Sequence, residues 1–133
     1  MDNAVHAASA PIVAVVDDDL AVRSSLAFAM GNEGFSIRPY ESADALLSDS
    51  RAGEVNCFVI DYKLTGQNGL ELIDELRRRG VAAPAVLITT APHAHVRRAA
   101  AAGCITIVEK PLLGDALFQE VRAALAGYPS SRT

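Results

Sequence analysis

The chain has 133 residues, a formal net charge of −4 and a hydrophobic fraction of 50%, which predicts one globular domain with a single core. This apolar content, combined with 21% charged residues, excludes an intrinsically disordered chain. No apolar run approaches the roughly 18 residues of a membrane span, and residues 1–10 lack the basic and apolar regions of a signal peptide. The acidic balance argues against nucleic-acid contact by this chain. We therefore expect a cytoplasmic protein without a membrane segment.

Strand-like and helix-like segments alternate along the chain. Short apolar runs rich in β-branched residues predict buried strands, at residues 12–16, 35–40, 55–60, 85–88 and 104–108. Apolar residues at helical spacing predict a helix after each strand, at residues 20–32, 43–47, 69–79, 93–102 and 112–126. This alternation predicts an α/β fold with a five-stranded parallel sheet that is doubly wound, with helices on both faces.

Capping residues mark the helix starts in this pattern. Asp19 and Ser42 precede helical segments and are N-cap candidates, and Asn68 with Glu71 predicts a capping box. Pro39 lacks the N–H that a central strand donates, which favours an edge position for its strand. A stripe at four-residue spacing in the last helix is expected to be core packing, and it consists of Leu113, Leu117, Val121 and Leu125.

The two cysteines, Cys57 and Cys104, are expected to be buried, reduced and structural. They fall on the strands predicted at 55–60 and 104–108. A third strand separates these two, so the Cα atoms of the cysteines should lie ~9–10 Å apart. Because a disulfide needs Cα atoms within about 7 Å, we expect two free thiols.

Polar residues stand at the carboxyl ends of the predicted strands. They are Asp17, Asp18, Asp61, Thr89 and Lys110. The carboxyl ends of parallel strands meet at one edge of a sheet, where such folds bind their ligands. We therefore expect these side chains at one rim, although they are far apart in the sequence.

This set of residues favours phosphoryl chemistry. Three carboxylates within a few ångströms repel one another, and a hard divalent cation relieves that repulsion. Mg²⁺ suits an all-oxygen site because it binds through one or two carboxylates and keeps positions for water and phosphate. Lys110 supplies a positive charge for a phosphate and Thr89 a hydroxyl donor. Asp61 is then the candidate nucleophile for phosphoryl transfer.

Four motifs resemble the receiver domains of two-component response regulators, and in particular the FixJ-like subgroup. They are VVDDD at 15–19, IDYKLTGQNG at 60–69, LITT at 87–90 and EKP at 109–111. The resemblance covers about residues 11–126. It implies the flavodoxin-like strand order 2-1-3-4-5. It also implies a signalling switch that catalyses its own aspartyl phosphorylation and dephosphorylation, and not a metabolic enzyme.

The resemblance further implies roles for individual residues. Asp61 would accept a phosphoryl group from a phosphohistidine of a sensor histidine kinase or phosphotransfer protein. The Mg²⁺ ligands would be Asp17, Asp18, Asp61 and the backbone carbonyl of Lys63. Thr89 would be the switch hydroxyl and Lys110 the lysine that contacts the phosphate. Phosphorylation would draw Thr89 toward the phosphate and change the shape of a partner-binding face.

Several positions depart from the family pattern, among them Thr90 and the segment at 91–98, and two of the departures affect the expected switch and the loop beside it. Ile107 replaces the switch aromatic of the fifth strand. It can neither rotate as an aromatic does nor form the usual hydroxyl contact, so its coupling to Thr89 is expected to differ. Thr65 stands where a proline is common, and we expect a looser loop there.

A second hypothesis is a haloacid-dehalogenase-type phosphohydrolase, which also uses an Asp nucleophile with Mg²⁺. Asp17 would then be the nucleophile and Asp19 the acid/base. Against this hypothesis, Ala21 stands where that motif has Thr or Val. In addition, no second Asp follows Asp115, as the late acidic motif would require, and the chain is short for that fold.

The motifs also predict the organisation of the chain. We expect a disordered N-terminal extension at residues 1–10, a receiver domain at 11–127 and a C-terminal tail or linker start at 128–133. No helix-turn-helix or other effector follows residue 127 in this sequence. The chain is therefore expected either to act on a downstream protein partner by itself or to belong to a longer regulator with a DNA-binding effector domain.

Overall fold

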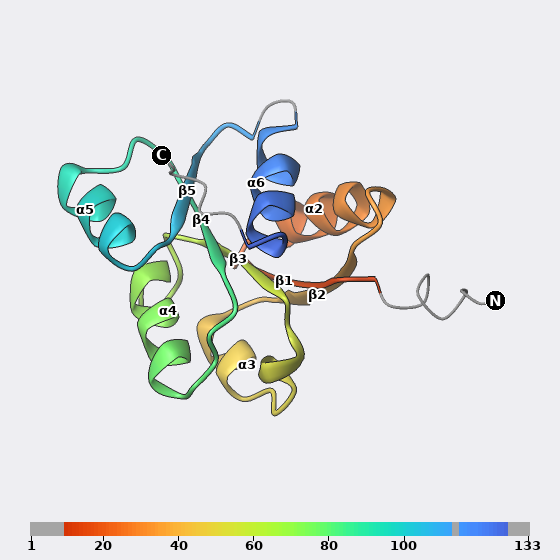
Figure 1. Cartoon of the computed structure of the whole chain (residues 1–133), viewed down its shortest axis with the longest axis horizontal. Helices are drawn as coiled ribbons and strands as arrows, with labels where there is room; N and C mark the ends of the chain where they lie inside the picture. Colours follow the sequence, from red (N-terminus) through yellow and green to blue (C-terminus); the bar gives the residue numbers. More distant parts are fainter. Residues whose placement is uncertain (1–9, 113–114, 128–133) are drawn as a thin grey trace.

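A parallel sheet organises the molecule, which the computed structural model describes for residues 10–112 and 115–127 (Figure 1). Its strands are β1 (Ile12–Val16), β2 (Ser36–Tyr40), β3 (Cys57–Asp61), β4 (Ala85–Thr89) and β5 (Thr106–Glu109). Neighbouring strands pair in parallel, in the order β2-β1-β3-β4-β5. This order confirms the predicted doubly wound α/β fold with a flavodoxin-like sheet.

Helices cover both faces of the sheet, with α2 and α6 on one face and α3, α4 and α5 on the other (Figure 1). The helices are α2 (Leu20–Asn32), α3 (Ala43–Leu47), α4 (Gly69–Arg78), α5 (Ala94–Ala102) and α6 (Ala116–Leu125), with a 3₁₀ turn at Ala52–Glu54. Every connection between consecutive strands therefore carries a helix, as parallel crossovers do.

The strands separate two hydrophobic cores. Side chains alternate between the faces of a strand, so Val13 and Val15 of β1 pack toward α2 and α6. Ala14 and Val16 pack on the opposite face, toward α3 and α4. Strands β3 and β4 are buried along their whole length. This two-sided burial is why these segments are continuous apolar runs in the sequence.

The predicted helix starts are confirmed by their caps. The Asp19 side chain accepts a hydrogen bond from the Ala21 N–H at 2.9 Å, and Ser42 caps α3 in the same way. Asn68 and Glu71 form the expected capping box at the start of α4. These local bonds fix the points at which the loops after β1, β2 and β3 turn into helices.

The fifth strand begins later than predicted. β5 starts at Thr106, because Cys104 adopts a φ of 57°, which an extended strand cannot include. The prediction that both thiols are buried is therefore wrong for Cys104, which is exposed, and confirmed for Cys57. Both cysteines are free, as expected.

The other boundaries differ less. α6 begins at Ala116 and not at residue 112, since Leu112 packs against the α2–α6 core in a non-helical conformation. β2 begins at Ser36 and β3 at Cys57, each slightly later than expected. Pro39 lies on β2, an edge strand of the sheet, as predicted.

Some expectations fall on residues that the structure does not describe. The N-terminal extension expected at 1–10, apart from Ala10, lies outside the described residues, as do the tail expected at 128–133 and Leu113 of the apolar stripe. The rest of that stripe faces the α2–α6 core, with Leu117 and Val121 buried and Leu125 partly buried.

Gly69, the first residue of α4, lies against the end of β3. A Cβ at this position would lie 2.7 Å from the Asp61 carbonyl oxygen and 2.7 Å from Leu87 Cδ1. We therefore expect Gly69→Ala to lower the free energy of unfolding by about 2 kcal/mol, measured by urea denaturation. The matched control is Gly31→Ala in α2, where no atom lies within 4 Å. It should leave stability unchanged or raise it by up to about 1 kcal/mol, and equal losses in both variants would contradict the close approach.

The two thiols should differ in reactivity. Burial raises the pKa of the Cys57 thiol to about 12, whereas Cys104 is exposed in a turn. A thiol reagent such as dithionitrobenzoate should therefore modify Cys104 rapidly in the folded protein and Cys57 only after unfolding in urea. Rapid reaction of a Cys104→Ser variant in its folded state would contradict the burial of Cys57.

Candidate functional site

The ends of adjacent strands bring the predicted residues to one rim of the sheet. Asp17 directly follows β1, and Asp61 ends the neighbouring strand β3. Asp61 is in register with Ile88, so Thr89, the last residue of β4, lies one step further along the next strand. Thr89 is in turn in register with Glu109, the last residue of β5. The predicted convergence at the carboxyl ends is confirmed.

Asp17, Asp18 and Asp61 form an acidic cluster. Each offers one carboxylate oxygen, and these oxygens lie within 4.8 Å of one another. Asp17 is 3% exposed and Asp61 is 6% exposed, whereas Asp18 is exposed. Two of the three negative charges are therefore buried next to each other, where water screens their repulsion least.

Burial is the main influence on both inner carboxyls. It raises the pKa of Asp61 above the ordinary range of an aspartate, while the Lys110 ammonium opposes this rise and the Asp18 carboxylate adds to it. It also raises the pKa of Asp17, where a hydrogen bond from the Asp19 N–H opposes the rise and the charge of Asp61 adds to it. The site thus holds negative charge that the protein neutralises only in part.

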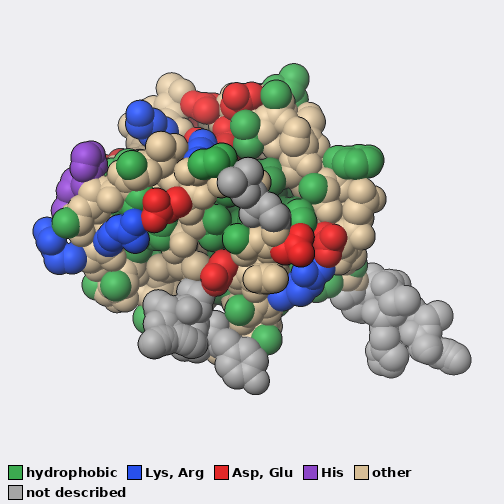
Figure 2. All heavy atoms as spheres, turned by 90° about the horizontal axis from the view of Figure 1, so that it is seen from above, with side chains coloured by type: hydrophobic (Ala, Val, Ile, Leu, Met, Phe, Trp, Pro, Cys, Tyr) green, Lys and Arg blue, Asp and Glu red, His purple; other side chains and the backbone are tan. Residues whose placement is uncertain are grey.

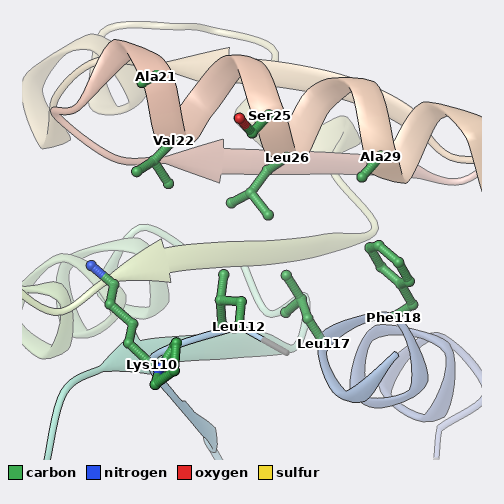
Figure 3. A pocket seen from close by; sticks show the side chains of 10 residues that line it. Ala21, Val22, Ser25, Leu26, Ala29, Lys110, Leu112, Leu117 and Phe118 are labelled. Atoms are coloured by element: carbon green, nitrogen blue, oxygen red, sulfur yellow. The ribbon is translucent and has the colours of Figure 1, made fainter. Parts of the chain in front are cut away.

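Lys110 is the positive group facing this cluster. Its Nζ lies 3.3 Å from Asp61 Oδ1, and Figure 3 shows the side chain reaching to the tip of β3. The Lys110 backbone N–H donates a hydrogen bond to the Thr89 carbonyl oxygen at 2.8 Å. This bond holds Lys110 next to Thr89, a residue that is only 6% exposed.

The loop after β1 is held by two hydrogen bonds to Asp17. The Asp19 N–H donates to Asp17 Oδ1 at 2.9 Å, and Arg23 Nη1 donates to the Asp17 carbonyl oxygen at 2.7 Å. Sequence reasoning missed Arg23, which is one of several polar residues in the first turns of α2. Its contact orients the backbone of Asp17 from the helix side.

The loop after β3 is closed on itself. The Gly69 N–H donates to the Tyr62 carbonyl oxygen at 2.8 Å, and Lys63 and Asn68 form an antiparallel bridge. At its tip, Thr65 Oγ1 donates to Asp18 Oδ2 at 3.1 Å. The loop after β3, which we expected to be looser, is therefore bonded to the acidic cluster through Thr65. The sequence analysis assigned Thr65 no role in the site.

Two further predicted positions are Lys63, which lies beside the cluster, and Ile107, which lies on β5. Burial raises the pKa of Asp61, and a hydrogen bond from the Lys63 backbone N–H opposes that rise, which places this backbone next to the site. Ile107, the predicted switch position, is half-buried on β5 in register with Leu87. It packs against the core on the α3–α4–α5 side of the sheet, so its contribution is apolar contact.

A groove of about 580 Å³ runs between α2 and α6. Figure 2 looks onto this face and shows hydrophobic side chains gathered in the middle of the molecule. Lys110 and Pro111 line one end of the groove, and in Figure 3 the lysine nitrogen points from there toward β3. The groove therefore reaches Lys110, whose ammonium faces Asp61 of the acidic cluster.

The donor atoms of the cluster determine which metal ions it suits. Each of the three side chains in this cluster offers a carboxylate oxygen. Hard cations such as Mg²⁺ prefer this type of ligand. Zinc sites use Cys and His ligands more often. The cluster is thus able to bind a metal ion, and its chemistry fits Mg²⁺.

The response regulator receiver domain family matches residues 13–122. The chain therefore belongs to this family of two-component signalling proteins. It is 40% identical over 116 residues to the transcriptional regulatory protein FixJ of Azorhizobium caulinodans, which supports a FixJ-like receiver. That match covers 85% of this chain and 54% of FixJ. The chain spans about half the length of the curated relatives it matches.

Solved structures agree with this assignment. FixJ-N is 29% identical with a TM-score of 0.73, covering 88% of this chain and 94% of that chain. The response regulator TrrA from Thermotoga maritima, solved in complex with Mg(2+)-BeF, is 26% identical with a TM-score of 0.73, covering 86% of this chain and 98% of that one. The comparisons do not support the phosphohydrolase hypothesis. Within residues 10–112 and 115–127, no helix combines the length and apolar character needed to cross a membrane.

The buried charge of Asp17 should reduce the stability of the metal-free protein. In the wild type, the Asp19 N–H lies 2.9 Å from Asp17 Oδ1. An asparagine at position 17 keeps an amide oxygen that can accept this hydrogen bond, but it removes the negative charge that the Asp61 carboxylate repels. We expect Asp17→Asn to raise the free energy of unfolding by about 1 kcal/mol in EDTA, measured by urea denaturation. Asp74→Asn, at an exposed position of α4, is the control and should change it by less than about 0.5 kcal/mol. A less stable Asp17→Asn variant would contradict the electrostatic argument.

Proposed function

We propose that Asp61 is the phosphoacceptor of this receiver domain, and that its phosphoryl donor is a phosphohistidine on a sensor histidine kinase or phosphotransfer protein. One observation carries this proposal. Asp61 is a buried carboxylate with two further carboxylates on one side and the Lys110 ammonium 3.3 Å away on the other. This arrangement aligns a nucleophile and charge-neutralising groups around the position of a phosphoryl group.

In the proposed reaction, a carboxylate oxygen of Asp61 attacks phosphorus and forms the P–O bond of an acyl phosphate. The P–N bond to the donor imidazole breaks, and its electron pair returns to the imidazole nitrogen. Lys110 offsets the charge on the phosphoryl oxygens, and the Thr89 hydroxyl donates a hydrogen bond to one of them. Attack of water on the same phosphorus breaks the P–O bond to Asp61, restores its carboxylate and releases inorganic phosphate. The domain would thus catalyse its own phosphorylation and dephosphorylation, with no separate metabolic substrate.

The proposed cofactor is Mg²⁺, which would neutralise charge shared between the acidic cluster and the phosphoryl group. Asp17, Asp18 and Asp61 would hold it together with the backbone carbonyl of Lys63. The all-oxygen donor set supports this choice, as does the Mg(2+)-BeF complex of the related TrrA. Asp17 and Asp18 keep their carboxylates near Asp61 for this purpose.

The proposed switch uses Thr89 and Ile107. Drawing the Thr89 hydroxyl toward the phosphoryl group would move the end of β4, and Ile107 would respond through packing, since it contacts the core below α4 and α5. The partner-binding face that would change is the one formed by α5 and α6, the fourth and fifth helices of the chain, together with β5. This mechanism needs no aromatic hydroxyl on β5.

The partners and the location are part of the same proposal. The relatives that the chain matches include transcriptional regulatory proteins such as FixJ and TdiR, which supports either a DNA-binding effector domain or a downstream protein partner as the output of this receiver. We propose that the receiver unit covers residues 11–127, supported by the family match over 13–122. Phosphoryl groups of sensor kinases come from ATP, so the proposed location is the cytoplasm.

Mapping the phosphorylated residue tests the proposal. The protein is incubated with Mg²⁺ and acetyl phosphate, the acyl phosphate is reduced with borohydride, and the modified residue is identified by mass spectrometry. Because Asp61 is the member of the cluster that pairs with Lys110, we expect the label on Asp61 and its complete loss in Asp61→Asn. Asp44→Asn, an exposed acid in α3, should be labelled like the wild type. A label on Asp17, or no label on any residue, would overturn the proposal.

A further inference from the structure

The exposed member of the acidic cluster has a hydrogen-bond donor from another loop. Thr65 Oγ1, in the loop after β3, donates to Asp18 Oδ2 at 3.1 Å across 47 positions of sequence. We infer that Thr65 is a positioning residue, whose hydroxyl holds the Asp18 carboxylate in the orientation that binds Mg²⁺. This inference rests on the proposed function of the cluster as the Mg²⁺ site.

Asp18 needs such a partner more than its neighbours do. Asp17 is buried and bonded to the Asp19 N–H, and Asp61 is buried and faces Lys110. The Asp18 side chain is exposed and lies beside these two carboxylates. Repulsion from these two nearby carboxylates favours rotamers that turn the Asp18 side chain into solvent. Its hydrogen bond to Thr65 opposes that rotation.

Thr65 can act as a fixed anchor because its loop is closed. The Gly69 N–H bonds the Tyr62 carbonyl oxygen at 2.8 Å, Lys63 bridges Asn68, and the capping box of α4 begins immediately after the loop. The backbone of Thr65 therefore has little conformational freedom, and its hydrogen bond restricts the Asp18 side chain as well. An Asp18 side chain that is already held in place loses less conformational entropy when the cation binds.

The hydrogen bond and a metal bond are compatible on one carboxylate. A carboxylate has two oxygens and about four acceptor sites, so a bond from Thr65 leaves acceptor capacity for a cation. Hydrogen bonds to the ligands of a metal orient those ligands and strengthen binding. Loss of the hydroxyl should therefore weaken Mg²⁺ binding without disturbing the exposed loop.

The experiment compares Thr65→Val, which removes the hydroxyl at nearly constant volume, with Thr65→Ser, which keeps it. Mg²⁺ is titrated into each protein without a phosphodonor, and binding is followed through the amide NMR shifts of residues 17–19 and 61–66. We expect Thr65→Val to raise the Kd for Mg²⁺ about 3- to 10-fold, the effect of one hydrogen bond. Thr65→Ser should remain within about 2-fold of the wild type. Thermal unfolding in EDTA should be the same for all three proteins, because Thr65 is exposed.

The outcomes separate this inference from the proposed function. If the wild type binds Mg²⁺ and Thr65→Val binds it equally or more tightly, the positioning role is wrong while the Mg²⁺ site stands. If Thr65→Ser is as weak as Thr65→Val, the hydroxyl is not responsible and the inference also fails. If the wild type shows no saturable Mg²⁺ binding at its cluster, the proposed function itself fails.

Discussion

The mutual repulsion of three carboxylates at one rim of the sheet is the constraint on which the site depends. Strands β1 and β3 are neighbours that end at the same rim, so Asp17 and Asp61 come together below the surface. Burial raises the pKa of both, and Lys110, 3.3 Å from Asp61, offsets only part of the charge. The folded chain therefore carries unfavourable electrostatic energy at this rim. Binding of a cation releases that energy, which makes the cluster responsive to ligands.

The core is organised to keep this rim in place. β3 is buried on both faces and ends with Asp61, and α4 starts so close to it that position 69 accommodates only a glycine without strain. The capping box of α4 then fixes the loop between them. Fold and site thus share the same residues, since the packing that stabilises the sheet also determines the position of Asp61.

Much of this could be predicted from sequence because two independent signals coincide. The β-branched runs identify buried parallel strands, and the polar residues directly after them must then meet at the rim, as Asp61 and Thr89 do. The hydrogen bond from Thr65 to Asp18 could not be predicted, because it depends on how two loops fold toward each other. The position of Cys104 could not be predicted either, because it also depends on the local backbone conformation. The apolar run that includes Ile105 continues the strand pattern, whereas the backbone at Cys104 turns with positive φ before the ladder begins.

The contacts around Thr89 determine how a change at the site reaches the surface. Its backbone carbonyl accepts the Lys110 N–H, and it is in register with Glu109, which bonds Arg97 of α5 at 2.5 Å. That ion pair is about half exposed on both sides, so it contributes little to stability and is easily rearranged. Ile107 lies two residues earlier on the same strand and contacts the core through apolar packing. In the proposed switch, a displacement of Thr89 would therefore act on α5 through the β4–β5 backbone and through packing, because position 107 of β5 is an isoleucine without a hydroxyl.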